Sequence, residues 1–437
     1  MRFDTLAGWL EWQSSLHPAA IDLGLERVAE VWRRLGGRIV CPLVTVAGTN
    51  GKGSSVAMLD AIWQAAGYRV GSFSSPHLMR YNERIRLDGE PLSDAAIIEA
   101  FARIDRARGD LSLTYFEFGA LAALDCFARA RPDVVVLETG LGGRLDAVNI
   151  VDADVALITA IGLDHTEWLG EDRDRIAREK AGILRAGRAA VCSDPQPPAG
   201  LLEQAARLDV PLRVYRRDFD ATPNPGGGWR WSMEGRRREA LPLPALRGDY
   251  QLQNAAGALA VTELLGGRLP LETAAIREGL ASVSLPGRFE VRPGRPTLIL
   301  DVAHNTQAVA ALRDTLRRYR CRGRVLAVFS ALRDKRLGEM IARIDDRIHQ
   351  WHPAGLEGPR GLDGKTVAAA VARHAHGRRA PPRERVSEAL GDALAEARDD
   401  DCILVFGSFL SVAAACRALE DHDGQARRTM TPEHDGR

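Results

Sequence analysis

The sequence predicts an α/β fold, in which a larger domain with a mostly parallel sheet precedes a smaller α/β domain. Three short runs rich in valine and isoleucine predict the first sheet: Leu43–Ala47, Val134–Leu137 and Val155–Thr159. Their hydrophobicity is continuous rather than alternating, which is typical of parallel strands covered on both faces. Residues that can carry chemistry follow each run. Because sites in open α/β sheets collect at the carboxyl ends of the strands, we expect these residues to converge.

The chain length also indicates two domains. Its 437 residues exceed what one hydrophobic core normally serves. The α/β pattern restarts after Pro286-Gly287, and further strands are expected at Thr297–Val302, Arg324–Ser330 and Cys402–Phe406. We therefore place the domain boundary between residues 286 and 287.

Two segments depart from the α/β pattern. Asp218 to Leu246 is rich in Pro, Gly, Trp and Arg, and the alternation at Trp229–Met233 predicts a β-hairpin in a small extra antiparallel sheet. The polar residues from about Asp421 onward are expected to be frayed or disordered. The predicted organisation is therefore a first domain at 1–286, a second at 287–420 and a disordered tail at 421–437.

The composition is that of a soluble globular protein. It is 45% hydrophobic and 27% charged, and the formal net charge of +1 gives no global field toward nucleic acid or membrane. Neither a signal peptide nor an apolar run of membrane-spanning length is visible. The six cysteines lack a C-x-x-C pair and several lie in apolar runs, so we interpret them as buried, reduced thiols. We expect a cytoplasmic monomer with no nucleic-acid or membrane partner.

The glycine-rich segment Val44 to Ser55, VTVAGTNGKGSS, is the most informative part of the chain. A strand, a glycine turn with Lys52 and a helix form the arrangement that holds nucleotide phosphates on backbone N–H groups. It differs from the standard phosphate loop, because Val46 replaces the early glycine and Gly53 follows the lysine. A glycine turn without nucleotide is the alternative, but such a turn gives the lysine no role.

Three further groups follow expected strands of the first domain. Glu138 ends a strand, where a buried carboxylate needs a cation, and Mg²⁺ fits beside a nucleotide. A glutamate that caps a helix or pairs with Arg144 is the alternative. The glycines after Glu138 do not form a dinucleotide-binding fingerprint, because Leu145 occupies the third glycine position. His165 follows the next strand, and the serines near Ser75 can offer hydroxyls to a metal or phosphate; a structural histidine is the ordinary alternative.

The second domain carries a smaller set of candidates. Asp301 and His304 end an expected strand and could hold a nucleotide or a substrate amine, although Asp and Asn also favour helix starts. The turn at Gly407-Ser408-Phe409 follows the last strand, and a substrate could approach it there.

Nine motifs occur in order along the chain: GTNGKGS, SSPHLMRYNERIR, LTYFEFG, LETGLGGRLDAVNI, LDHTEWLG, EKAGI, LPGRFE, DVAHN and FGSF. With them the chain closely resembles the bacterial dihydrofolate synthase/folylpolyglutamate synthase family, which is related to the Mur peptide ligases. The resemblance covers nearly the full length except the tail. It implies that the first domain binds ATP and pterin, and that the second is a Rossmann-like, glutamate-binding domain.

The resemblance also implies roles for individual residues. Lys52, His165 and Lys180 match catalytic positions, and Lys180 matches a lysine that relatives carry as a carbamate, although its helical pattern alone would make it a solvated lysine. The implied Mg²⁺ positions are Ser75, Glu138 and His165, and a monovalent cation is a further candidate cofactor. The implied ATP contacts are Gly48, Thr49, Asn50, Gly51, Lys52, Gly53, Ser54, Asn254, Arg288, Asp301 and His304.

The substrate positions complete the expected site. The pterin positions implied by the resemblance are Asp22, Thr114, Phe116, Glu117, Leu145, Asp146 and Ala147. Arg80 and Arg84 are expected to meet anionic substrate groups, and Ser408 lies at the turn named above.

The implied reaction is ATP-dependent amide formation through an acyl phosphate. A substrate carboxylate takes the γ-phosphoryl group, and the amine of L-glutamate then displaces phosphate. The expected substrates are 7,8-dihydropteroate and, for further glutamates, tetrahydrofolates. A folylpolyglutamate synthase with the second activity alone is the main alternative. A Mur-type ligase for a cell-wall nucleotide and a regulatory nucleotide-binding module without catalysis are weaker alternatives.

Overall fold

A computed structural model describes residues 2–430 of the protein. Contacts between Cα atoms divide the chain into two compact units, Met1–Leu285 and Pro286–Arg437. This division lies one residue from the boundary expected in the sequence. The two parts are called the N-terminal and the C-terminal unit below.

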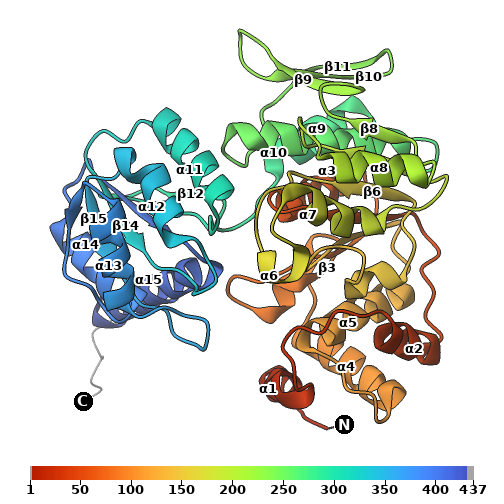
Figure 1. Ribbon diagram of the computed structural model, residues 1–437, viewed down its shortest axis with the longest axis horizontal. Coiled ribbons are helices and arrows are strands. Elements are labelled where there is room, and N and C mark those ends of the chain that lie inside the picture. Colours follow the sequence, from red (N-terminus) through yellow and green to blue (C-terminus); the bar gives the residue numbers. More distant parts are fainter. Residues whose placement is uncertain (1, 431–437) are drawn as a thin grey trace, which may run out of the picture. The chain divides into compact units, whose positions relative to one another are not determined.

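An eight-stranded sheet forms the centre of the N-terminal unit, in the order β4-β3-β2-β5-β1-β6-β7-β8 (Figure 1). β3 and β4 are antiparallel to their neighbours, and the other strands pair in parallel. The strands are β1 (Leu43–Ala47), β2 (Val70–Phe73), β3 (Ile85–Leu87), β4 (Glu90–Pro91), β5 (Val134–Glu138), β6 (Val155–Ile158), β7 (Ala189–Cys192) and β8 (Leu212–Val214). The three expected runs are β1, β5 and β6, and every residue in them is buried, so the predicted parallel sheet is confirmed.

Helices cover both faces of this sheet, which explains the continuous hydrophobicity of its strands. Successive residues of β1 point to opposite faces: Val44 and Val46 pack with α3, α9 and α10, whereas Leu43 packs with α1, α2, α4 and α5. A third cluster joins β6, β7 and β8 to α7 and α8. The helices of this unit are α1 (Leu6–Leu16), α2 (Glu26–Leu35), α3 (Lys52–Ala65), α4 (Asp94–Arg108), α5 (Tyr115–Ala130), α6 (Thr166–Leu169), α7 (Arg173–Lys180), α8 (Ala199–Arg207), α9 (Asp249–Leu264) and α10 (Thr273–Ser282).

The expected extra sheet is present and has three strands rather than two. β10 (Trp229–Met233) lies between β9 (Phe219–Pro223) and β11 (Arg236–Leu241), and both pairings are antiparallel. Buried and partly buried side chains alternate along β10, as the sequence pattern predicts. Its buried residues Trp229, Trp231 and Met233 face the core of α3 and α9. The Trp231 indole N–H also donates to the Ala256 carbonyl of α9 at 3.1 Å.

The C-terminal unit contains a six-stranded sheet in the order β12-β13-β17-β14-β15-β16. Only β12 is antiparallel to its neighbour. The strands are β12 (Glu290–Arg292), β13 (Thr297–Leu300), β14 (Val325–Phe329), β15 (Gln350–Pro353), β16 (Arg378–Arg379) and β17 (Cys402–Phe406). The helices are α11 (Thr306–Tyr319), α12 (Leu337–Ile344), α13 (Gly364–His374), α14 (Val386–Glu396) and α15 (Phe409–Met430). The second α/β domain expected from the sequence is confirmed.

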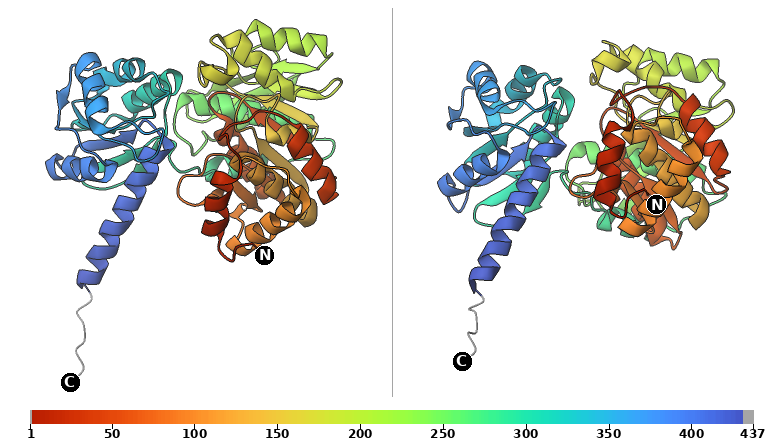
Figure 2. Two further views of the ribbon diagram at one scale, coloured as in Figure 1. Left: turned by 60° about the horizontal axis from the view of Figure 1, so that its bottom comes forward. Right: turned by 90° about the horizontal axis from the view of Figure 1, so that it is seen from below.

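The end of the chain differs from the expected disordered tail. Residues 421–430 continue helix α15, which leads away from the sheet of its own unit (Figure 2). This stretch contains no proline and a single glycine, the residues that usually end a helix. Its polar composition alone therefore does not end α15. Residues 431–437 lie outside the described residues.

The cysteines also differ from the expectation. Cys321 and Cys402 form a disulfide, whereas Cys41, Cys126, Cys192 and Cys416 are free thiols, and the first two of these are only half-buried. The disulfide partners are 81 residues apart in sequence, and the pairing of Val325 with Cys402 brings them together. No local spacing could therefore reveal the bond.

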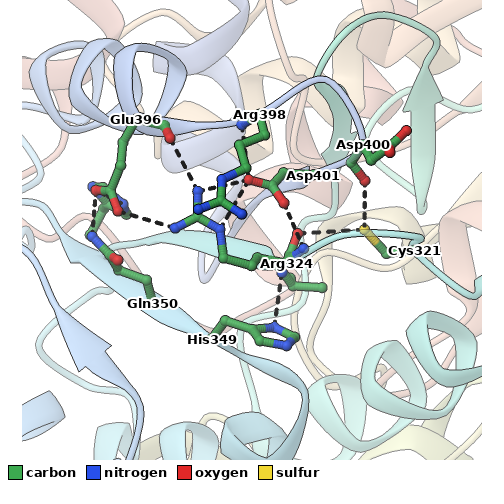
Figure 3. A network of polar contacts seen from close by, with 10 residues as sticks. Cys321, Arg324, His349, Gln350, Glu396, Arg398, Asp400 and Asp401 are labelled. Carbon is green, nitrogen blue, oxygen red and sulfur yellow. Dashed lines mark hydrogen bonds and ion pairs between the residues drawn. The ribbon is translucent and has the colours of Figure 1, made fainter.

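A polar network lies next to Cys321 of this disulfide (Figure 3). Asp401 accepts hydrogen bonds from the backbone N–H of Arg324 at 2.6 Å and from its Nη2 at 2.8 Å. The same carboxylate accepts the backbone N–H of Arg398 at 2.9 Å, and Arg324 also donates to the Glu396 carbonyl at 3.1 Å. The network joins the starts of β14 and β17 to the end of α14.

Within residues 2–430, no helix combines the length and the apolar character that a membrane span requires.

Gly279 is expected to control the packing of α10 on α3. A Cβ atom at this position would lie 2.5 Å from the Cα of Ile62, which is backbone and cannot rotate away. Gly279→Ala should therefore lower the free energy of unfolding by about 1–3 kcal/mol, measured by urea unfolding. Gly267→Ala is the control, because nothing lies within 4 Å of its added Cβ. Equal unfolding midpoints for the two variants would contradict this packing argument.

Candidate active site

The glycine loop between β1 and α3 is built so that side chains are excluded from it. A Cβ on Gly48 would lie 1.7 Å from the Thr159 Oγ1. Gly51 has a φ of +92°, and its added Cβ would lie 2.4 Å from the Asn254 Oδ1. Helix α3 begins at Lys52, so its first N–H groups, at residues 52–54, lie at the loop. The loop therefore has the local geometry of an anion-binding helix start.

Hydrogen bonds hold this loop against the segment that follows β6. The Thr49 N–H donates to the Ala160 carbonyl at 2.8 Å. The Thr49 hydroxyl donates to the Gly162 carbonyl and accepts the Gly162 N–H, each at 3.0 Å. Asp164 and His165 follow this segment, and His165 precedes α6 in a left-handed conformation with φ of 51°. The loop and the His165 segment thus share one edge of the sheet.

Glu138 lies at the same edge, at the end of β5. It is 4% exposed, its Oε1 lies 4.0 Å from the Lys52 Nζ, and its Oε2 accepts the Ser75 N–H at 3.2 Å. A carboxylate, a serine and a lysine beside a phosphate loop are the chemistry that a nucleotide-bound Mg²⁺ uses. Among the described residues, no three His, Cys, Asp or Glu side chains form a metal cluster by themselves. The protein donors fit a metal whose remaining ligands come from phosphate or water.

Lys180 is buried rather than solvated, contrary to what its helical pattern alone indicates. It ends α7, is 3% exposed, and its Nζ donates to the Gly48 carbonyl at 2.8 Å. Burial, and then the positive charge of Lys52, lower the pKa of Lys180 to about 7. Its amine is therefore neutral in a large fraction of molecules near neutral pH, unlike that of an ordinary lysine.

Helix α9 supports the loop from the other side. Asn254 approaches Gly51, and its Nδ2 donates to the Gln251 Oε1 at 3.0 Å. Gln251 in turn donates from Nε2 to the Ser54 Oγ at 3.3 Å. Asn254, implied by resemblance as an ATP contact, is thus placed at the phosphate loop by packing that the sequence pattern does not show.

The expected pterin residues form a second polar group in this unit. Arg27 donates from Nη1 to the Asp22 Oδ2 at 2.6 Å and from Nη2 to the Glu117 Oε1 at 2.8 Å. Glu117 also accepts the Thr114 N–H at 2.7 Å, which completes the capping box of α5. His17 Nε2 lies 3.1 Å from the Asp22 Oδ2. Arg27 and His17 were not among the residues expected at this site. The only indication in the sequence is that both lie close to Asp22 along the chain.

The remaining pterin candidates lie in the turn after β5. Asp146 is buried, accepts the Leu141 N–H at 2.8 Å and the Val148 N–H at 3.1 Å, and burial raises its pKa to about 6. It is flanked by Leu145, which is half-buried, and Ala147, which is buried. Phe116 packs against this turn, since a Cβ on Gly140 would lie 2.5 Å from its ring.

The two candidate arginines after β2 differ in their surroundings. Arg80 is exposed and donates to the Asp94 Oδ1 at 3.2 Å. Arg84 is partly buried, donates from Nε to the His77 Nδ1 at 2.8 Å, and lies over the ring of Tyr81 at 5.4 Å. Burial, and then the Arg84 charge, lower the pKa of His77 to about 4. Arg84 thus fits the role of an anion ligand better than Arg80 does.

In the C-terminal unit, the candidates gather near the ends of β13 and β17. Asp301 is buried and accepts the backbone N–H groups of Phe289 and Ala303, both at 2.8 Å; burial raises its pKa. The Arg288 guanidinium lies 5.0 Å from the centre of the Phe409 ring, and the His304 ring centre lies 6.0 Å from it. Ser408, the neighbour of Phe409, is buried and accepts the Leu410 N–H at 3.2 Å.

We expect the affinity for ATP to depend on the glycine at position 51. Gly51→Ala combines a strained φ with a collision at Asn254, so the affinity for the analogue AMPPNP should fall at least about tenfold, measured by calorimetry. Gly67→Ala is the matched control, because Gly67 has a φ of +84° and nothing within 4 Å of its added Cβ. Similar AMPPNP affinities in both variants would show that the loop is not the phosphate site.

Two family models match the chain. The Mur ligase middle domain matches residues 46–197, and the Mur ligase glutamate ligase domain matches residues 287–409. The first match contains the glycine loop, Glu138 and Lys180, and the second contains Arg288, Asp301 and Ser408.

The chain is also similar to named enzymes. Dihydrofolate synthase/folylpolyglutamate synthase of Escherichia coli K12 is 44% identical over 95% of this chain and 96% of the relative. The enzyme of the same name from Haemophilus influenzae is 39% identical over 95% of this chain and 98% of the relative.

Solved structures agree with these relatives over nearly the full length. E. coli FolC in complex with DHPP and ADP has a TM-score of 0.91 and 42% identity, and the match covers 97% of this chain and 99% of that chain. The bifunctional folylpolyglutamate synthase/dihydrofolate synthase of Yersinia pestis with AMPPNP and Mn ion has a TM-score of 0.89 and 45% identity, over 96% and 99%. The resemblance seen in the nine motifs is thereby confirmed: the chain belongs to the bacterial dihydrofolate synthase/folylpolyglutamate synthase family of Mur-type ligases.

Proposed function

We propose that this protein uses ATP to join L-glutamate to 7,8-dihydropteroate, and that it adds further glutamates to tetrahydrofolates. The observation that carries the proposal is the group at one sheet edge: the glycine loop with Lys52, the Glu138 carboxylate next to Ser75, and the buried Lys180 amine. Relatives at 44% and 39% identity are named for both activities. Related structures contain ADP, or AMPPNP with Mn and L-glutamate.

The reaction requires two displacements. An oxygen of the substrate carboxylate attacks the γ-phosphorus of ATP, the bond from that phosphorus to ADP breaks, and an acyl phosphate forms. The amine nitrogen of L-glutamate then attacks the carbonyl carbon, phosphate leaves, and the nitrogen loses a proton. Because a carboxylate is a poor electrophile, phosphorylation supplies the leaving group, and positioning and charge neutralisation supply the catalysis.

The residues of the phosphate loop would perform this neutralisation. N–H groups at the start of α3 and the Lys52 ammonium would bind the phosphates of ATP. Glu138, Ser75 and His165 would hold Mg²⁺, which supplies positive charge at the phosphate oxygens when it is bound. In the C-terminal unit, Arg288, Asp301 and His304 are the proposed nucleotide contacts, and Ser408 is a proposed substrate contact.

Lys180 is proposed to act as a carbamate. Its lowered pKa leaves a neutral amine, whose lone pair can form a C–N bond with CO₂ while a proton is released. The product is an anion beside the loop, where it could help to hold the metal or its water ligands. The modification thus replaces a buried amine, whose protonated form Lys52 disfavours, by an anion near the Lys52 charge.

The pterin is proposed to bind at the group formed by Asp22, Thr114 and Glu117 together with the turn at residues 145–147. Asp22 and Glu117 are held by the same guanidinium, so their orientations depend on one another. The proposed location is the cytoplasm, because the reaction consumes ATP; a monomer is proposed as the active form.

Phosphate release measured with the purified protein, ATP, Mg²⁺ and L-glutamate tests the function. We expect release with dihydropteroate and, in a separate assay, with tetrahydrofolate. Release with tetrahydrofolate alone would favour the monofunctional folylpolyglutamate synthase. No release with either substrate would overturn the proposed function.

The carbamate leads to a prediction for Lys180. Lys180→Ala should lower kcat by at least about 10²-fold, and formate or acetate should restore part of the activity because they replace the missing anion. Lys52→Ala is the control: it should lose activity to a similar degree without any rescue, because it lacks a cation. Carbon-13 NMR after exchange with labelled bicarbonate should show a carbamate signal in the native protein but not in K180A. An inactive K180A protein that neither acid rescues would contradict the carbamate.

A further inference from the structure

The segment between Ser75 and Arg84 joins the two halves of the proposed site. Ser75 donates its N–H to Glu138 at the phosphate end. At the other end, the Arg84 guanidinium lies 5.5 Å from the centre of the Tyr115 ring, next to Thr114 in the sequence. A group placed on this segment therefore lies between the proposed metal position and the proposed pterin position.

The backbone of this segment is firmly held by one carboxylate. Glu83 accepts the backbone N–H groups of Leu78, Met79 and Arg80 at 2.7, 2.8 and 2.6 Å. Arg84 follows Glu83 directly, and its backbone carbonyl accepts the Ser74 N–H at 2.9 Å. The segment thus gives Arg84 a rigid base.

Arg84 lacks the partner that a guanidinium of this kind normally has. Its neighbour Arg80 pairs with Asp94, and Arg86 donates from two nitrogens to the Gly89 carbonyl. Among the described residues, Arg84 has no carboxylate partner, and its one hydrogen bond is from Nε to the His77 Nδ1 at 2.8 Å. Its two Nη groups are therefore left for an anion from outside the chain, and a planar guanidinium binds a carboxylate best through two parallel N–H groups.

The orientation of this guanidinium depends on His77. The Nε–H of arginine is always a donor, so the His77 Nδ1 must be the acceptor and the imidazole must be neutral with its proton on Nε2. The faces of Tyr81 and Tyr115, at 5.4 and 5.5 Å, restrict the guanidinium plane, but they give no direction within that plane. The hydrogen bond to His77 supplies this direction.

We propose that His77 is a positioning residue, which orients Arg84 so that its two Nη groups bind a carboxylate of a substrate. The inference rests on the proposed function, because that reaction supplies two carboxylate substrates, dihydropteroate and L-glutamate. Either could provide the group, and the experiment distinguishes them. His77 itself does not touch the reacting atoms and acts through Arg84.

The test is a double-mutant cycle on the full-length protein, read as separate KM values for ATP, L-glutamate and dihydropteroate. His77→Phe keeps an aromatic ring next to Tyr81, whose ring centre lies 5.8 Å away, and removes the acceptor. His77→Asn keeps an acceptor oxygen near the position of Nδ1. Arg84→Lys keeps the charge and removes both the Nε–H and the paired Nη groups.

We expect H77F and R84K each to raise the KM of the same carboxylate substrate by about tenfold, with little change in the KM for ATP. H77N should restore most of the affinity. The H77F/R84K double variant should be no worse than R84K alone, because His77 acts only through Arg84. A shift confined to L-glutamate would identify the amino acid carboxylate as the ligand, and a shift confined to dihydropteroate would identify the other.

Three results would overturn the proposal: unchanged KM values for both carboxylate substrates in H77F, effects that multiply in the double variant, or an equal rise in the KM for ATP. Should H77F fail to fold, H77L replaces it, and unchanged KM values in R84K would suffice to overturn the proposal. Native protein without phosphate release would refute the proposed function instead, so the two failures are distinguishable.

Discussion

The parallel pairing of β1 with β5 and β6 is the constraint on which the site depends. Its register places Val46 opposite Glu138, and Ala47 opposite Ile158. The three adjacent strands therefore end at one edge of the sheet. The glycine loop follows β1, a turn follows Glu138 of β5, and the segment that leads to His165 follows β6. Because helices cover both faces of these strands, a slip in register would exchange the side chains that pack on the two faces and would move these groups apart. The fold and the site are thus stabilised by the same interactions.

Burial then changes the chemistry of the charged groups at this edge. Removing Lys180 from water lowers its pKa, and removing Asp146 from water raises its pKa, so each is shifted toward its neutral form. Glu138 is buried as well, but it lies within 4.0 Å of the Lys52 ammonium. The neutral amine is also the form of Lys180 that reacts with CO₂ in the proposed carbamate, so burial prepares this side chain for the modification.

Much of this arrangement follows from local sequence. Valine-rich runs predict β1, β5 and β6, and the glycines around Lys52 predict the loop, because both signals lie within a few residues. The disulfide between Cys321 and Cys402, the contact of Asn254 with Gly51 and the burial of Lys180 could not be predicted from the residues alone. Each depends on a partner more than 80 residues away, and such a contact exists only after the sheet has formed. The resemblance implies roles for Asn254 and Lys180, but it does not give the contacts that place them.

Contacts made only in the folded chain also explain why the sequence alone does not show which arginine of this site can bind a substrate anion. Arg80 and Arg84 are separated by one helical turn and lie in one motif, yet an exposed carboxylate satisfies the first, whereas a neutral imidazole holds the second. A guanidinium whose partners are neutral retains its full charge for a ligand, whereas an ion pair must be broken before it can bind one. The partner of an arginine therefore decides whether it can recognise a substrate carboxylate. The proposed reaction uses two substrates that carry carboxylates, and the neutral partner of Arg84 leaves the charge of this guanidinium for one of them.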